Sequence, residues 1–119
     1  MTAAANYRRI VVKLGTNLLT GGSDKLDLSA IGAIVDQVAR LHAEGAGVVV
    51  VSSGAVAAGR SRLGERRVHR DIPFRQVLAA VGQSQLMNAY DHLFAAHNIV
   101  TAQTLLTRRD LSDRLSYLN

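Results

Sequence analysis

Two apolar segments that each run into a turn of small residues constrain the fold of this chain most strongly. The first extends from Ile10 to Leu14 and leads into Gly-Thr-Asn, and the second extends from Val48 to Val51 and leads into Ser-Ser-Gly-Ala. Four consecutive valines without polar alternation are typical of a parallel strand that is covered on both faces. The two segments therefore predict adjacent parallel strands of an α/β fold, with both turns at the carboxyl edge of the sheet.

The residues between the two predicted strands have the pattern of an amphipathic helix. Gly-Gly-Ser-Asp at 21–24 predicts an exposed turn, and Ser29 is a candidate N-cap. Helical spacing then continues to His42, and Glu-Gly-Ala-Gly at 44–47 ends it. Its apolar positions are Ile31, Ile34, Val35, Val38 and Leu41. Strand, helix and strand together predict a βαβ unit.

The second half of the chain predicts further elements. A helix is expected from position 53 or 54 to 63, in which Gly59 allows another backbone to approach closely. Pro73 is placed to open a long helix that reaches Phe94, and a third strand is expected at 99–103. A last helix is expected over 110–119. The broad apolar surface of the long helix fits either the chain's own core or a second subunit, which makes a homo-oligomer an expectation.

Composition excludes several classes of protein. Apolar residues make up 48% of the 119 positions, enough for the core of one small domain. No uncharged apolar run is long enough for a transmembrane helix or a signal peptide, so a cytoplasmic protein without membrane contact is expected. The chain has no cysteine, and its histidines lack the spacing of zinc ligands. No metal site is predicted.

The formal net charge of +5 comes mainly from the segment 60–70. Few aromatic residues accompany these arginines, which disfavours nucleic acid as a partner because base stacking is a large part of such binding. A solvated loop is the first alternative for this segment. The second is a flexible basic flap that attracts small acidic molecules.

Lys13 and the turn after it have the properties of an anion site. A lysine in an apolar strand is costly to bury unless a negative charge compensates it, and the strand end adds free backbone N–H groups. A salt bridge is the structural alternative, and contact with a phosphate is the functional one. The segment 15–22 lacks the ending of a P-loop, and the chain contains no GxGxxG.

Ser53 lies at the second turn. The sequence around it is not Gly-x-Ser-x-Gly, so a hydrolase nucleophile is disfavoured. Its hydroxyl is instead a candidate for binding a polar group of a substrate, with backbone N–H groups of Gly54 and Ala55 at the helix start. A simple N-cap role for Ser53 is the alternative.

Four segments of the chain resemble motifs of the amino acid kinase family. They are VVKLGTN at 11–17, VSSGAVAAGR at 51–60, LAAVGQSQL at 78–86 and LLTRRD at 105–110. The resemblance implies a three-layer αβα sandwich with a mainly parallel sheet, of which these residues form the N-terminal half. Gly-Thr-Asn and Ser-Ser-Gly-Ala, in place of the Gly-Gly turns of related kinases, resemble the branch that acts on glutamate.

That branch implies a reaction and roles for the candidate residues. The reaction is ATP-dependent phosphorylation of the L-glutamate side-chain carboxylate to L-glutamyl 5-phosphate, the first step of proline biosynthesis, with Mg²⁺ accompanying ATP and proline as feedback inhibitor. The resemblance implies that Lys13 contacts the ATP phosphates and the transition state and that Gly15 and Thr16 line the phosphate channel. It also implies that Ser53 binds glutamate, with Gly54 and Ala55 as further candidates.

Chains of this family continue well beyond 119 residues. Residues 1–119 are therefore expected to form the N-terminal, substrate-side portion of the kinase domain without its nucleotide-binding half, and to be inactive alone. The alternative is a non-catalytic module that binds an anion or an amino acid through the same two turns.

Overall fold

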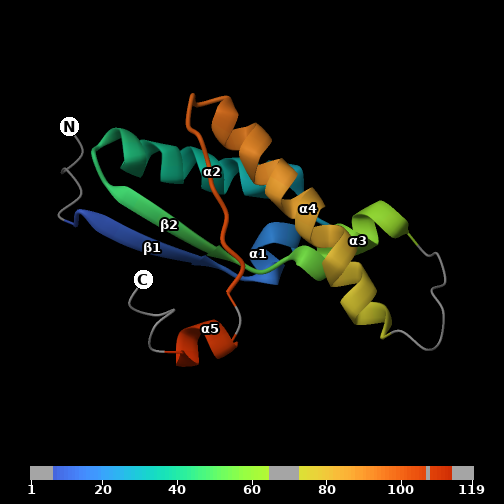
Figure 1. The fold of residues 1–119 in the computed structure, drawn as a ribbon. Coiled ribbons are helices and arrows are strands. Elements are labelled where there is room, and N and C mark those ends of the chain that lie inside the picture. The colour runs from blue at the N-terminus through green and yellow to red at the C-terminus, as the bar shows by residue number, and fades with distance from the viewer. Residues whose placement is uncertain (1–6, 65–72, 107, 114–119) are drawn as a thin grey trace.

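A computed structural model describes residues 7–64, 73–106 and 108–113 of the chain. Figure 1 shows a pair of strands with helices packed along them and beyond their ends. In chain order the elements are β1 Arg9–Leu14, α1 Thr16–Thr20, α2 Leu28–Ala43, β2 Gly47–Ser52, α3 Ala55–Leu63, α4 Phe74–Ala95 and α5 Arg108–Ser112.

The two strands form a parallel sheet whose register runs from Arg9 beside Gly47 to Leu14 beside Ser52. Helix α2 connects them, so the predicted βαβ unit and the α/β class are confirmed. Because the strands are parallel and in register, both end at the same edge of the sheet. The turns that follow them, at Gly15 and Ser53, are thereby neighbours.

The N-cap of helix α2 lies two residues before the candidate N-cap Ser29. Asp27 is the N-cap, and its Oδ1 accepts hydrogen bonds from the backbone N–H groups of Ser29 at 3.0 Å and Ala30 at 3.2 Å. A carboxylate at this position satisfies two of the free N–H groups and also interacts favourably with the helix dipole. Ser29 therefore lies inside the first turn.

The hydrophobic core lies on one face of the sheet. Side chains of β1 and β2 alternate, and one set packs against α2 and the second half of α4. In Figure 1, α2 runs along the strands, whereas α4 crosses α2 at an angle. The buried members of this core are Leu14, Leu19, Ile31, Val35, Val38, Ala58, Leu86, Tyr90 and Phe94. Three of them, Ile31, Val35 and Val38, are among the apolar positions that the sequence predicted for α2.

The opposite face of the sheet is open. Val11, Val49 and Val51 are 69%, 59% and 50% exposed, respectively. The expectation that the valine run is covered on both faces is therefore wrong for the described residues, which place a helical layer over one face only. Valine favours a strand whichever face is covered, so its apolar run does not report how many layers surround the sheet.

Helices α3 and α4 cross in very close contact. A Cβ atom added to Gly59 would overlap the carbonyl oxygen of Leu78, and one added to Gly82 would overlap the carbonyl oxygen of Ala55. The predicted close approach of a backbone at Gly59 is confirmed. The crossing lies beyond the carboxyl ends of the strands (Figure 1), so it sets where both helices stand relative to the strand ends.

Three segments differ from the sequence-based expectations. The short helix α1 was not expected. Residues 99–106 have no regular structure where a third strand was expected, because the Ile99 N–H bonds to the Phe94 carbonyl at 3.1 Å and Val100 is 95% exposed. A strand needs a partner for its backbone, and this segment closes the end of α4 instead. The expected last helix begins at Arg108, and positions 114–119 lie outside the described residues.

The apolar residues of α4 between Val77 and Phe94, except the exposed Ala80, are buried or half-buried within the chain itself. The packing of α3 and α2 against α4 thus accounts for the breadth of its apolar surface without a second subunit. None of the helices within the described ranges is both long and apolar enough to cross a membrane.

Candidate functional site

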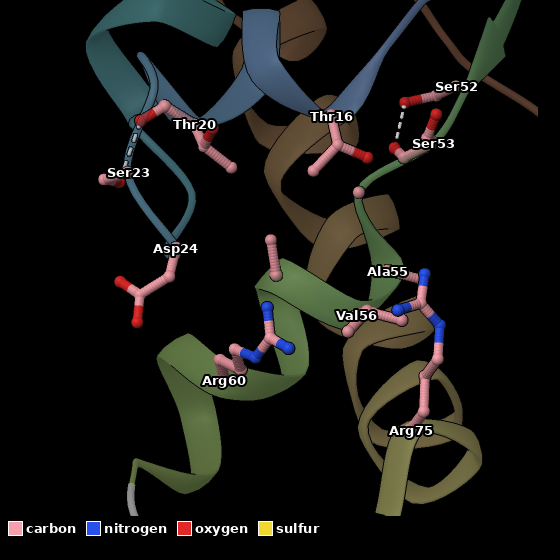
Figure 2. A pocket seen from close by; sticks show the side chains of 12 residues that line it. Thr16, Thr20, Ser23, Asp24, Ser52, Ser53, Ala55, Val56, Arg60 and Arg75 are labelled. Atoms are coloured by element: carbon pink, nitrogen blue, oxygen red, sulfur yellow. Dashed lines mark hydrogen bonds between the residues drawn. The ribbon is translucent and has the colours of Figure 1, made fainter.

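A pocket of about 290 Å³ lies where the two strands end and α3 begins. Its volume is close to the lower end of the usual range for ligand sites, about 300 Å³, which suits a small ligand. Figure 2 shows hydroxyl groups on one side and two arginines approaching from the other. The lining residues are Thr16, Thr20, Ser23, Asp24, Ser52, Ser53, Gly54, Ala55, Val56, Ala57, Arg60 and Arg75.

The turn from β2 into α3 forms one wall of the pocket. Gly54 is the N-cap of α3 with a φ of 106°, and an added Cβ atom would lie 3.0 Å from Leu19 Cδ1. The backbone conformation therefore favours glycine here, and an added Cβ would also have to displace the Leu19 side chain. No side chain of the described residues caps α3, which leaves the N–H groups of its first turn available to bind an anion.

Ser53 lines the pocket but does not cap α3. Its backbone N–H and its hydroxyl both donate to the carbonyl oxygen of Leu14, at 2.9 Å and 3.3 Å. These bonds tie the second turn to the end of β1. The hydroxyl oxygen keeps its acceptor capacity for a ligand.

Thr16 follows Gly15, the N-cap of α1, and shares the pocket with Ser53, Gly54 and Ala55. The structure thus brings together four of the six candidate residues, from both turns. Gly15 and Lys13 are not among the lining residues.

Lys13 lies near the same edge of the sheet, beside Val51, but on the open face. Its side chain is exposed, so the premise that an anion must compensate a buried ammonium group is wrong. No ion pair joins Lys13 to another residue in the described ranges, which also removes the salt-bridge alternative. An exposed and unpaired ammonium group at a strand end is available for a ligand.

Arg60 and Arg75 are lining residues that the sequence analysis did not single out as ligands. Helical side chains tilt toward the helix N-terminus, so Arg60 on α3 extends back toward the start of its own helix (Figure 2). Arg75 comes from the first turn of α4. The lining residues include two guanidinium groups and one carboxylate, that of Asp24, so the net charge of the pocket lining is positive.

Residues 65–70 of the basic segment lie outside the described residues, so the alternatives of a solvated loop and a basic flap stay predictions. Within the described ranges, no group of three or more His, Asp or Glu side chains is placed to hold a metal ion. The pocket offers hydroxyl, backbone N–H and guanidinium donors, together with the carboxylate of Asp24. These donors suit a small anion with carboxylate or phosphate groups.

Several known proteins that are similar to this chain over most of its length are glutamate 5-kinases. A glutamate 5-kinase of Dehalococcoides mccartyi (strain CBDB1) is 58% identical over 113 residues, which is 95% of this chain and 30% of that protein. Glutamate 5-kinases of Herpetosiphon aurantiacus and Escherichia coli O1:K1 / APEC are 50% and 49% identical, over 95% and 97% of the chain and 30% and 31% of their own lengths. The chain thus spans about 30% of the length of these relatives.

The pattern that defines the amino acid kinase family matches residues 8–118. This match includes both strands, both turns and the helices that surround the pocket. Since it extends over almost the entire sequence, the chain belongs to the amino acid kinase family.

Proposed function

We propose that this chain forms the acceptor-binding part of a kinase that transfers phosphate from ATP to the side-chain carboxylate of L-glutamate, the reaction for which its relatives are named. The observation that carries the proposal is the pocket at the strand ends, in which Ser53, the start of α3 and two arginines surround a space of about 290 Å³. At neutral pH glutamate is a small molecule with two carboxylate groups and one ammonium group, and these donors match its carboxylates.

In this proposal Ser53 and the N–H groups of Gly54 and Ala55 hold the acceptor, while Arg60 and Arg75 neutralise carboxylate charge. An oxygen of the side-chain carboxylate attacks the γ-phosphorus of ATP. The new O–P bond forms as the bond from the γ-phosphorus to the bridging oxygen breaks, and ADP leaves with that electron pair. The product is an acyl phosphate.

In this proposal Lys13 and the turn after β1 interact with the phosphate groups of ATP. The exposed ammonium group stabilises negative charge on the transferred group, and Gly15 and Thr16 border the path of the phosphates. Phosphoryl transfer depends mostly on such positioning and electrostatic stabilisation. Mg²⁺, when bound to the nucleotide, neutralises phosphate charge.

The proposal is tested with the full-length gene product. Incubation with L-glutamate, ATP, Mg²⁺ and hydroxylamine is expected to give glutamyl hydroxamate, and omission of glutamate is the control. The 119-residue chain alone is expected to give none. Glutamate binding by the full-length protein in calorimetry, with no hydroxamate and no ADP, would contradict the kinase and support a non-catalytic amino acid binding module.

Replacing Arg75 or Arg60 by glutamine is expected to raise the KM for glutamate. A charged hydrogen bond contributes roughly 1.5 kcal/mol or more, which corresponds to about tenfold in affinity for each arginine. The KM for ATP should change little. Arg62→Gln is the matched control, because Arg62 is also an exposed arginine of α3 but does not line the pocket. Equal KM values for the pocket variants and the control would remove the arginines from the acceptor site.

A further inference from the structure

Tyr90 places a hydroxyl group in the core within hydrogen-bond distance of Ser52, one of the residues that line the pocket. The residue is only 6% exposed, and its ring stacks with that of Phe94 at a centroid distance of 6.4 Å. Its hydroxyl lies 2.7 Å from Ser52 Oγ. Burial raises the pKa of Tyr90, an effect that the hydrogen bond to Ser52 opposes. The tyrosine therefore keeps its proton at neutral pH.

The direction of the hydrogen bonds follows from the number of protons. Ser52 Oγ donates to the carbonyl oxygen of Ser53 at 2.7 Å, a bond drawn in Figure 2. A serine hydroxyl has one proton, so the bond between Ser52 and Tyr90 must use the tyrosine proton. The Tyr90 hydroxyl thus donates to Ser52 Oγ, and Ser52 Oγ donates to the Ser53 carbonyl. These two hydrogen bonds form a relay from Tyr90 to the backbone of Ser53.

This relay reaches the backbone of the pocket wall. The carbonyl of Ser53 and the N–H of Gly54 belong to one planar trans peptide and point in opposite directions. Holding the carbonyl therefore also sets the direction of the Gly54 N–H at the start of α3. The opposite side of the turn is held by the bonds from Ser53 to Leu14.

We propose that Tyr90 is a positioning residue of the acceptor pocket, which through Ser52 orients the Ser53–Gly54 peptide for binding the acceptor. The inference that this orientation serves glutamate rests on the proposed function. Tyr90 is 37 positions from Ser53 in the sequence, and α4 brings it there by packing against the sheet. It does not touch the acceptor itself.

The first experiment measures hydrogen exchange in the full-length gene product. Tyr90→Phe removes only the hydroxyl and is expected to speed amide exchange in the peptide that contains residues 52–55, while α2 stays as protected as in the unmodified protein. Tyr7→Phe is the matched control, since Tyr7 is 73% exposed. Unchanged exchange at 52–55, or an equal increase in α2, would overturn the positioning role whether or not the protein is a glutamate kinase.

The second experiment measures kinetics. Loss of one hydrogen bond from the relay is expected to raise the KM for glutamate roughly three- to tenfold in Tyr90→Phe, with the KM for ATP unchanged. Ser52→Ala should have the same effect, and the double variant should add nothing further, because both changes break one relay. Additive effects, or equal changes in both KM values, would overturn the proposal. A parent protein that forms no hydroxamate would instead refute the proposed function, and hydrogen exchange would still decide the role of Tyr90.

Discussion

Gly82→Ala is expected to destabilise the protein by about 3 kcal/mol or more. The added Cβ would overlap the carbonyl oxygen of Ala55 and would lie 2.5 Å from the Gly59 nitrogen, so backbone atoms rather than a mobile side chain block it. Overpacking in a core costs about 1–3 kcal/mol when side chains can adjust, and here two helices must move apart. The free energy of unfolding is measured by urea denaturation followed by circular dichroism.

Gly32→Ala is the matched control for this experiment. Gly32 also lies within a helix, but the nearest atom to its added Cβ is Leu93 Cδ2 at 3.9 Å. This substitution should leave stability unchanged or raise it by up to about 1 kcal/mol, because alanine is the better helix former. If Gly82→Ala unfolds at the same urea concentration as the control, the close crossing of α3 and α4 is refuted.

Lys13→Met is expected to lower kcat of the full-length gene product about 10²- to 10³-fold. Removal of one donor that stabilises transition-state charge has an effect of this size in other enzymes. The KM for glutamate should stay within a fewfold of its original value, since the acceptor pocket does not include Lys13. Initial rates are measured by hydroxamate formation over a range of glutamate and ATP concentrations.

Stability separates this role of Lys13 from a structural one. The side chain is exposed and has no ion pair with the described residues, so Lys13→Met should change the free energy of unfolding by less than about 0.5 kcal/mol. Lys25→Met removes another exposed lysine, from the turn before α2, and should leave kcat unchanged. Similar kcat values for the two variants would exclude Lys13 from the reaction.

Local patterns predicted the central part of the fold. The valine run, the helical spacing from Ile31 to Leu41 and the glycines between them were sufficient to predict the βαβ unit. The close approach at Gly59 was also predictable, because a glycine within an alanine-rich helix leaves room for another backbone. Each of these features depends on a stretch of about ten residues or fewer, in which side-chain type directly limits backbone conformation.

The sequence-based predictions are wrong where residues distant in the sequence determine the local structure. The segment at 99–103 has an apolar composition suited to a strand, yet it closes the end of α4. Ser29 is a good N-cap residue, but Asp27, two positions earlier, occupies that role. Helix α1 is short, and its Leu19 is fully buried against the core, so contacts beyond the local sequence support it.

The sequence by itself determined the parallel strands, the two small-residue turns and therefore the edge of the sheet at which a ligand site would form, because these depend on backbone preferences over short distances. It did not determine that Lys13 lies on an open face, that Arg75 joins Arg60 at the pocket, or that Tyr90 supports the Ser53 turn. Those relations arise from the crossing of α3 and α4 and from the packing of α4 on the sheet. They depend on which distant backbones fit together, and no single segment encodes that fit.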